Sequence, residues 1–381
     1  MTVALAVLGL LAGTWLTWRM PTLGAAAGRR RSVSIVVPAR DEEHRLPTLL
    51  RSLPAEPAGS DRGDGAGVEV IVVDDGSTDE TARLAAGLGA TVLAAGEPPP
   101  GWLGKPWACQ RGADAASGES LVFLDADVEL SAGALDRLLG ELDRCGGLVS
   151  VLPHHRTLRP SEELSAYFNA VEVMGVGAFT PVRHRAPAGA FGPCLATSAA
   201  DYRAAGGHAG VRDRLLDDVH LARRYRACGL PVTCRVGGDD VRFRMYPAGI
   251  GQLVEGWSKN IALGAVGTGP SAAGAAAMWV AATATIAAAA LSGTARWLAG
   301  GTGLPWLALA GWLLVAAQLH WILRRLGTFR WWTALGFVLP LAAFVAIFGR
   351  SVVLSTVRRR VRWRGRTVVL GRSGPEGPGA A

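Results

Sequence analysis

Hydrophobic positions along the chain fall into three successive patterns. An uncharged apolar run occupies residues 1–18 and is followed by Arg19 and by three arginines at 29–31. From Ser32 to Ala265, short β-branched runs alternate with amphipathic segments, and after Pro270 long apolar stretches follow. We therefore expect an N-terminal membrane anchor, a central globular domain and a C-terminal membrane region.

The central region alternates predicted strands with predicted helices. The strand candidates are VSIVVPA, VEVIVVDD, ATVLAA, SLVFLDAD and GGLVSVLP. The helix candidates are Glu42–Leu53, Asp79–Leu88, Ala108–Ala116 and Ala132–Leu142, and Ala58–Gly67 is a Gly/Asp-rich loop. Nearly continuous apolar strands indicate a sheet that is covered on both faces. The order predicts a Rossmann-like α/β domain with a mostly parallel central sheet, whose ligand site lies beyond the carboxyl ends of the strands.

The N-terminal run is interpreted as an anchor over residues 1–20 rather than as a signal peptide. A signal peptide carries positive charge before its apolar stretch, whereas here the arginines follow it. The positive-inside rule then places the N-terminus outside and the central domain in the cytoplasm. We expect a multi-pass protein of the plasma membrane.

Three segments of the C-terminal region, 272–354, are each long enough to span a bilayer: Ala272–Leu291, Leu304–Leu323 and Trp331–Leu354. Three spans after a cytoplasmic domain would leave the basic C-terminus outside, against the positive-inside rule. One segment is therefore expected to be re-entrant or interfacial. The candidates are the alanine-rich first segment and the last one, which contains Pro340.

Composition excludes several classes of protein. Apolar residues make up 50% of the chain and charged residues 18%, against about 25% charged residues in soluble domains, which argues against disorder and against a wholly soluble protein. The five cysteines form no CxxC pair, so neither a disulfide framework nor a zinc ribbon is expected. The tail 355–381 contains seven arginines and one glutamate and accounts for most of the net charge of +8. Such a cluster after an apolar segment is typical of binding to anionic lipids, and we expect no nucleic-acid partner.

Two acidic pairs follow predicted strands. In VVDDGSTDET, Asp74 and Asp75 either lie exposed at the mouth of the sheet or belong to a turn and helix cap. In SLVFLDADVEL, Asp125 and Asp127 follow an apolar run. Alternate residues of an extended strand face the same side, so both carboxylates can converge on one Mg²⁺ or Mn²⁺ held with substrate phosphates. The alternative for this second pair is a solvated turn.

Two further motifs combine charge with a helix start. Lys105 lies in the glycine-flanked turn of GWLGKPWAC, where it either reaches a phosphate or is a solvated loop lysine. Asp217 and Asp218 begin the helix of RLLDDVHLARRYRACGLPV, where they either complement the helix dipole or include a general base. The remaining polar candidates, His154, His155 and His208, match no ligand pattern and are interpreted as ordinary loop residues.

Together, PARDEE, DDGSTD and DAD resemble in order and spacing the donor-binding half of inverting family 2 glycosyltransferases with the GT-A fold. The resemblance covers most of Ser32–Ala265 and implies a nucleotide-sugar half at 32–130 and an acceptor half at 131–265. It implies that a nucleotide sugar is bound by Pro38, Arg40, Glu42, Asp74, Asp75 and Lys105, with Asp125 and Asp127 holding its diphosphate through a metal. The general base maps onto Asp218, and Asp217 replaces a commoner Glu.

The GWxGKPWAC form most resembles membrane enzymes that glycosylate carotenoid acids, the 4,4'-diaponeurosporenoate glycosyltransferases. The QxxRW motif of processive synthases is replaced by EGWSKN, in which Trp257 and Lys259 either close the site or, for Trp257, anchor the chain at the membrane interface. The resemblance implies transfer of glucose from UDP-glucose to a carotenoid or terpenoid carboxylic acid. The alternatives are a polyprenyl phosphate, hopanoid or glycerolipid acceptor, a non-catalytic scaffold that binds nucleotide, and a transporter.

Overall fold

The computed structural model describes residues 2–25, 31–54, 67–182, 186–267, 269–354, 360–363 and 366–369. Only the backbone is described for Thr2, for 259–267 and for the two C-terminal segments. The predicted loop Ala58–Gly67 lies outside the described residues except for Gly67, and so does most of the basic tail. Within that tail the backbone forms a hairpin of β11 (Arg360–Trp363) and β12 (Arg366–Val369).

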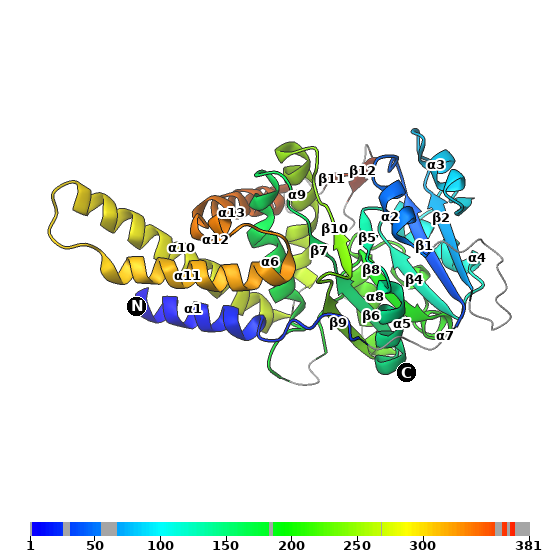
Figure 1. Ribbon diagram of the computed structural model, residues 1–381, viewed down its shortest axis with the longest axis horizontal. Helices are drawn as coiled ribbons and strands as arrows, with labels where there is room; N and C mark the ends of the chain where they lie inside the picture. The colour runs from blue at the N-terminus through cyan, green and yellow to red at the C-terminus, as the bar shows by residue number, and fades with distance from the viewer. Residues whose placement is uncertain are drawn as a thin grey trace.

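The globular part is built on a seven-stranded sheet with the order β3-β2-β1-β4-β8-β6-β9 (Figure 1). Its strands are β1 (Val33–Ala39), β2 (Val68–Asp74), β3 (Thr91–Ala94), β4 (Ser120–Leu124), β6 (Leu148–Leu152), β8 (Cys194–Ser198) and β9 (Val232–Val236). Neighbouring strands are parallel except where β8 pairs with β4 and β6. The mostly parallel sheet confirms the sequence prediction, whereas β8 and β9 were not predicted.

Helices cover both faces of this sheet. One face packs against α2 (Leu46–Ser52) and α5 (Ala134–Cys145), and the other packs against α4 (Gly104–Ala115), α7 (Ala199–Ala204) and α8 (Asp217–Ala227). Alternate residues of β1 serve the two faces, because Ile35 belongs to the first core and Val36 to the second. This two-sided burial explains why the strands are nearly continuous apolar runs. A short helix, α3 (Thr81–Gly87), connects β2 to β3.

A second layer joins the sheet to the apolar helices. The three-stranded sheet β5-β10-β7 consists of β5 (Val128–Leu130), β10 (Val241–Phe243) and β7 (His154–His155). Beside it lie η1 (Glu162–Ser165), α6 (Ala166–Val176) and α9 (Ile250–Gly267). A short turn of helix, η2 (His208–Val211), precedes α8. The apolar helix α6 therefore stands between the globular domain and the C-terminal helices.

The apolar helices α1 (Thr2–Leu16), α10 (Pro270–Leu298) and α11 (Trp306–Leu326) lie side by side and project away from the sheet (Figure 1). Small residues allow α1 to approach α10 closely, since a Cβ built on Gly9 or Gly13 would overlap Ala282 or Trp279. Gln318 of α11 joins the three helices: its amide donates to the carbonyl of Leu10 (2.7 Å) and accepts from the Trp279 indole (2.7 Å).

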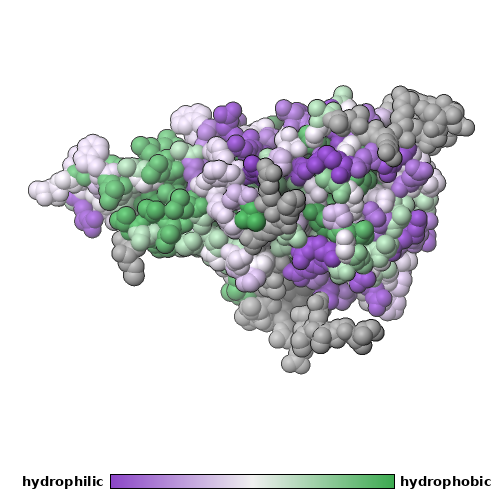
Figure 2. All heavy atoms as spheres, turned by 90° about the horizontal axis from the view of Figure 1, so that it is seen from below, coloured by the Kyte–Doolittle hydropathy of each residue, from purple (hydrophilic) through white to green (hydrophobic). Residues whose placement is uncertain are grey.

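The C-terminal segments differ in their suitability as spans. By length and composition, α10 and α11 are each able to cross a membrane, while α1 is a shorter apolar helix. The predicted span Trp331–Leu354 is divided into α12 (Trp331–Leu335) and α13 (Val338–Val353), and Pro340 lies in the first turn of α13 rather than in mid-helix. Figure 2 shows that apolar side chains cover the surface of the projecting helices. Exposed members include Leu8, Leu11, Leu307, Leu313 and Leu314.

Candidate active site

A cavity of about 970 Å³ opens where the carboxyl ends of β1, β2 and β4 meet, at the edge where the sequence predicts a ligand site. We call it the central cavity. It is lined by most of the residues singled out from the sequence: Pro38, Arg40, Glu42, Asp75, Lys105, Asp125, Asp127, Asp217, Asp218 and Trp257. The tertiary structure thus brings motifs separated by more than two hundred residues to one place.

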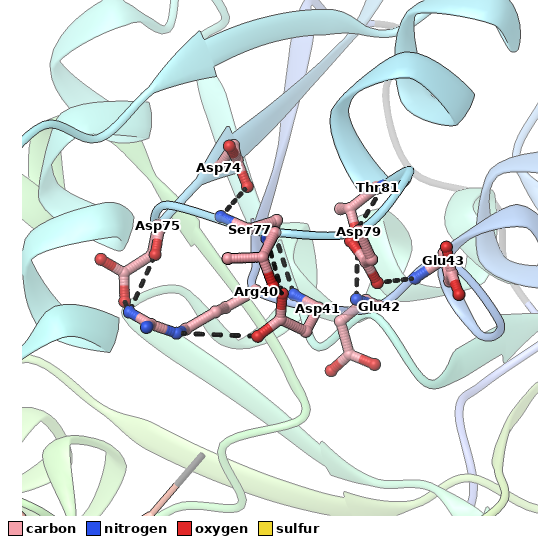
Figure 3. A network of polar contacts seen from close by, with 10 residues as sticks. Arg40, Asp41, Glu42, Glu43, Asp74, Asp75, Ser77, Asp79 and Thr81 are labelled. Carbon is pink, nitrogen blue, oxygen red and sulfur yellow. Dashed lines mark hydrogen bonds and ion pairs between the residues drawn. The ribbon is translucent and has the colours of Figure 1, made fainter. Parts of the chain in front are cut away.

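The segments after β1 and β2 hold each other through polar contacts (Figure 3). The Arg40 guanidinium donates to the carbonyl of Asp75 (3.0 Å) and lies 3.6 Å from its carboxylate. By contrast, the Asp74 carboxylate accepts from the backbone N–H of Ser77 (3.1 Å), and Asp74 is not among the cavity-lining residues. The two neighbouring aspartates therefore have different surroundings: Asp75 lines the cavity, whereas Asp74 caps the turn. A contact between Asp74 and a nucleotide stays a prediction.

The first turn of α4 joins two of the motifs. Gly104 lies against Asp75, and a Cβ built on it would be 2.5 Å from Oδ2 of that residue. The next residue, Lys105, belongs to the helix rather than to a preceding turn, and its Nζ lies 2.6 Å from Oδ1 of Asp125. Burial lowers the pKa of Lys105, but Asp125 and Asp217 outweigh this effect and raise it above its usual range. The lysine therefore remains a cation inside the cavity.

The Asp125/Asp127 pair has a different local geometry from the predicted one. The chain leaves β4 after Leu124 and makes a tight turn before β5 begins at Val128, so the two acids do not lie on an extended strand. The turn is closed by the Val128 N–H, which donates to the carbonyl of Asp125 (3.1 Å). Both carboxylates nevertheless line the cavity and provide hard oxygen donors suited to Mg²⁺ or Mn²⁺. In the part of the chain that is described, no cluster of three His, Cys, Asp or Glu side chains provides a cation site complete in itself.

Asp217 and Asp218 occupy the first turn of α8 and line the same cavity. Asp218 lies against the loop after residue 186, where a Cβ built on Gly192 would be 3.0 Å from its Oδ2. Burial, with a contribution from the neighbouring Asp217, raises the pKa of Asp218 above the ordinary aspartate value. A carboxyl with a raised pKa is suited to accept a proton near neutral pH.

The interpretation of His155 and His208 as loop residues is wrong, because both are buried. His155 is fully buried in β7 with its ring against Phe243 and Phe329, and burial lowers its pKa to about 4. His208 Nδ1 lies 2.8 Å from the Tyr202 hydroxyl and its Nε2 lies 3.9 Å from Asp217; burial lowers its pKa to about 4 as well. Neutral His208 therefore contributes to the packing behind the acidic pair of α8.

Two cavity residues were not anticipated from the sequence. Glu172 lines the cavity from α6, and burial, then repulsion from Asp218, raises its pKa to about 8. The sequence does contain an indication of a role for Glu172, because it is the single charged residue of AYFNAVEVMGV, an otherwise mostly buried helix. An isolated carboxyl in such a helix costs free energy unless it has a partner. Tyr246 also lines the cavity, with a positive φ of 55°. This backbone conformation is unfavourable for a tyrosine, and no pattern in the sequence predicts it.

Trp257 of α9 is 3% exposed and stacks on Phe168 with ring centroids 4.7 Å apart. Its indole N–H donates to the Ser165 hydroxyl (3.4 Å), so the ring faces the protein and the cavity rather than lipid headgroups. Lys259 lies on the same helix, but its side chain is outside the described residues. Its part in closing the site therefore stays a prediction.

The central cavity continues from the sheet into the apolar helices. This helix end is lined by Ala276, Ala277, Val280, Ala281 and Ala284 of α10 and by Phe344, Val345 and Phe348 of α13. The small α10 residues leave room beside the helix, and Ala277, Ala281 and Ala284 remain solvent-accessible. One continuous cavity thus has a charged sheet end and an apolar helix end.

Comparisons with known proteins agree with this architecture. Residues 34–164 match the family model for glycosyl transferase family 2. The chain is 38% identical over 246 residues to a 4,4'-diaponeurosporenoate glycosyltransferase of Staphylococcus haemolyticus, covering 63% of this chain and 64% of the relative. It is also 38% identical over 255 residues to the Staphylococcus aureus (strain USA300) protein of the same name, covering 66% of each. The chain therefore spans just under two thirds of the length of these curated relatives.

A solved structure matches over a larger part of the chain. A mannosyltransferase from Pyrobaculum calidifontis, in complex with GDP-Man and Mn²⁺, aligns with a TM-score of 0.52 over 94% of this chain and 100% of its own, at 19% identity. This likeness establishes the GT-A fold. The chain therefore contains a glycosyl transferase family 2 domain within a GT-A fold.

Proposed function

We propose that the protein is a membrane-bound inverting glycosyltransferase that transfers a hexose from a nucleotide sugar to a lipophilic acceptor. The observation that carries this proposal is the continuity of the central cavity. Its sheet end presents Arg40, Lys105 and the acids after β4, whereas its helix end is lined by alanines and phenylalanines. A hydrophilic donor and an apolar acceptor therefore each have a matching half of one cavity.

The donor half has the groups that a nucleoside diphosphate sugar requires. Arg40 and Lys105 are cations at the sheet end, and Asp125 and Asp127 would hold a divalent ion together with the diphosphate oxygens. A bound Mg²⁺ or Mn²⁺ supplies positive charge that stabilises the departing diphosphate. The donor is proposed to be a UDP-sugar, with glucose as the sugar. The structurally similar Pyrobaculum calidifontis mannosyltransferase, which was solved with GDP-Man and Mn²⁺, supports a nucleotide sugar and a divalent cation as a class.

The transfer itself needs a group that orients or deprotonates the acceptor opposite the leaving diphosphate. Asp218 lines the cavity together with Lys105 and Asp125, and its raised pKa suits a general base. Asp217 supports it from the same helical turn. For a carboxylic acid acceptor, which ionises below pH 7, Asp218 would orient more than deprotonate.

The acceptor is proposed to be a carotenoid or terpenoid carboxylic acid, giving a glycosyl ester. The names of the staphylococcal relatives support this class. The helix end of the cavity supports it physically, because it is lined by the small apolar residues of α10 and by phenylalanines of α13. A polyprenyl phosphate, hopanoid or glycerolipid acceptor in the same cavity remains the second candidate. The scaffold alternative is disfavoured because the two acids after β4, Lys105 and Asp218 all line the cavity.

The proposed location is the plasma membrane with the globular domain in the cytoplasm. In this arrangement α1, α10 and α11 cross the bilayer, which leaves Arg19, Arg324 and Arg325 at the domain side, as the positive-inside rule requires. In this proposal neither of the divided helices crosses, since α13 packs beside α9, η1 and α6 and α12 packs on α11. The arginines of residues 355–381 are then proposed to bind anionic lipids at the cytoplasmic face.

The test is transfer of radiolabelled sugar from UDP-glucose into the lipid extract of membranes that contain the full chain, with Mn²⁺ or with EDTA. Asp127→Ala is compared with Asp239→Ala, an exposed aspartate outside the central cavity. We expect metal-dependent label that Asp127→Ala abolishes and Asp239→Ala leaves unchanged, after which mass spectrometry identifies the acceptor. Absence of label from every common nucleotide sugar, with carotenoid acids and prenyl phosphates supplied, would revive the scaffold alternative.

A further inference from the structure

Glu172 occupies the wall of the central cavity that belongs to α6. Its helix neighbours Tyr167, Phe168, Val173 and Met174 are buried in the apolar core shared with the C-terminal helices. The other cavity-lining residues of α6 are Val171, Gly175 and Val176, which bear no polar side chain. Glu172 is therefore an isolated carboxyl on an apolar wall.

This carboxyl is not used by the protein's own contacts. Within the described ranges of the chain, Glu172 makes no hydrogen bond and no ion pair, although it lines the cavity and is partly accessible from it. A carboxyl removed from bulk water without a partner costs free energy that folding does not recover. Such a group is available for a ligand that enters the cavity.

Glu172 lies on the helix that packs between the sheet end and the helix end of the central cavity. Glu172 of α6, Asp218 of α8 and Tyr246 all line the central cavity, and the charge of Asp218 contributes to the raised pKa of Glu172. On its other side, α6 packs directly against α10, whose alanines line the helix end. An apolar acceptor lying along α10 with its polar head at Asp218 would bring that head past Glu172.

We propose that Glu172 binds the polar head of the acceptor and selects for a carboxylic acid by donating its proton in a hydrogen bond to the acceptor carboxylate. The inference rests on the proposed function and adds a specificity determinant to it. A hydrogen bond from a neutral O–H to a carboxylate is charge-assisted and about twice as strong as one to a neutral hydroxyl. An alcohol acceptor would therefore gain less from the same contact.

The electrostatics of the cavity agree with this role. Because burial and Asp218 raise the pKa of Glu172 to about 8, the side chain retains its proton near neutral pH. An ionised Glu172 would repel an incoming carboxylate beside the existing charges of Asp217 and Asp218. A neutral Glu172 replaces that repulsion with a donor.

The experiment compares two acceptors that differ only in the head group, all-trans-retinoic acid and retinol, with full-length protein in membranes. Glu172→Leu removes the donor, whereas Glu172→Gln retains an uncharged donor of similar size. Glu119→Leu is the matched control, because that glutamate is exposed at the start of β4 and does not line the cavity. Thermal unfolding of each variant establishes that the fold is intact.

We expect Glu172→Leu to raise KM for retinoic acid about tenfold or more, with KM for the nucleotide sugar unchanged. KM for retinol should change less than about threefold, and Glu172→Gln should keep KM for the acid within about threefold of the wild type. Equal losses on both acceptors, or a fall in kcat at constant KM for the acid, would overturn the assignment.

A binding measurement separates this inference from the proposed function. Quenching of tryptophan fluorescence gives Kd for retinoic acid and retinol without turnover, since Trp257 lines the cavity. If the wild type transfers no sugar, the proposed function fails while the selective loss of acid binding in Glu172→Leu still supports the acceptor contact. Unchanged Kd for the acid in Glu172→Leu overturns the inference even where transfer occurs.

Discussion

Lys105 Nζ lies 2.6 Å from Oδ1 of Asp125, which joins the first turn of α4 to the turn after β4. Each residue was expected to contact the donor separately, the lysine through phosphate and the aspartate through a metal. The two side chains form an ion pair at the sheet end of the central cavity. When donor and metal bind, the Lys105–Asp125 ion pair is therefore replaced by two interactions, one between the lysine and phosphate and one between the aspartate and the metal.

Replacing Lys105 by Met should change metal affinity and donor use in opposite directions. Without the competing cation, the carboxylates of Asp125 and Asp127 attract Mn²⁺ more strongly, so Kd for Mn²⁺ alone should fall several-fold. At the same time kcat/KM for the nucleotide sugar should fall about 100-fold, because the protein loses the lysine cation that would stabilise the diphosphate. Titration of Mn²⁺ by electron paramagnetic resonance, together with initial rates, checks both. Weaker Mn²⁺ binding in the variant would show that Lys105 does not compete for Asp125.

The role of Asp218 should depend on the chemistry of the acceptor. A hydroxyl acceptor needs a deprotonated base, so its rate should rise with pH through the raised pKa of Asp218 and level off above it. Asp218→Asn should remove that rise and lower kcat about 10²–10⁴-fold with a hydroxyl acceptor. The loss should be smaller with a carboxylic acid, which is already ionised. Initial rates over a pH series with both acceptors test this difference, and equal losses would contradict it.

Filling the helix end of the cavity should block the acceptor but not the donor. Ala281→Trp places a large ring on the cavity face of α10 and should lower transfer to a lipophilic acceptor at least about tenfold. Hydrolysis of the nucleotide sugar, a reaction confined to the sheet end, should be unchanged. Ala289→Trp is the control, because that alanine is exposed on the same helix outside the cavity. If both variants lose transfer equally, the acceptor does not use this channel.

Close packing of α1 on α10 should make the N-terminal helix sensitive to side-chain size. Gly13→Leu forces its side chain into the ring of Trp279, whose indole N–H bonds to Gln318, and should cost about 1–3 kcal/mol. Gly274→Leu, on α10 with open space around it, should cost under about 0.5 kcal/mol. Thermal unfolding of the purified proteins in detergent measures the difference. Similar midpoints for the two variants would mean that α1 does not pack on α10 as described.

Sequence periodicity determined the class of fold, because its signals are local. Apolar runs of β-branched residues marked β1, β2, β4 and β6, and the residues after them marked the cavity edge. It did not reveal β8, whose sequence CLATS has no distinctive pattern and whose antiparallel place depends on pairing with β4 and β6. The helix predicted from Glu42 begins only at Leu46 in the structure. Glu42 and Glu43 lie before it, and their backbone N–H groups donate to Thr81 and Asp79 at the start of α3.

Most candidate site residues could be predicted from the sequence, because a charged residue at the end of a predicted strand or at the start of a predicted helix can be recognised from the sequence alone. What only the tertiary structure decided is which of them meet, as Lys105 does with Asp125, and which further residues join them, as Gly104 does beside Asp75 and Glu172 does in the cavity wall. Those pairings depend on the crossover of distant elements, and the desolvation that raises the pKa of Asp218 and Glu172 exists only after the helices close around them. The same holds for the cavity, since alanines along α10 are ordinary apolar residues until α6 and α13 pack beside them and leave the space open.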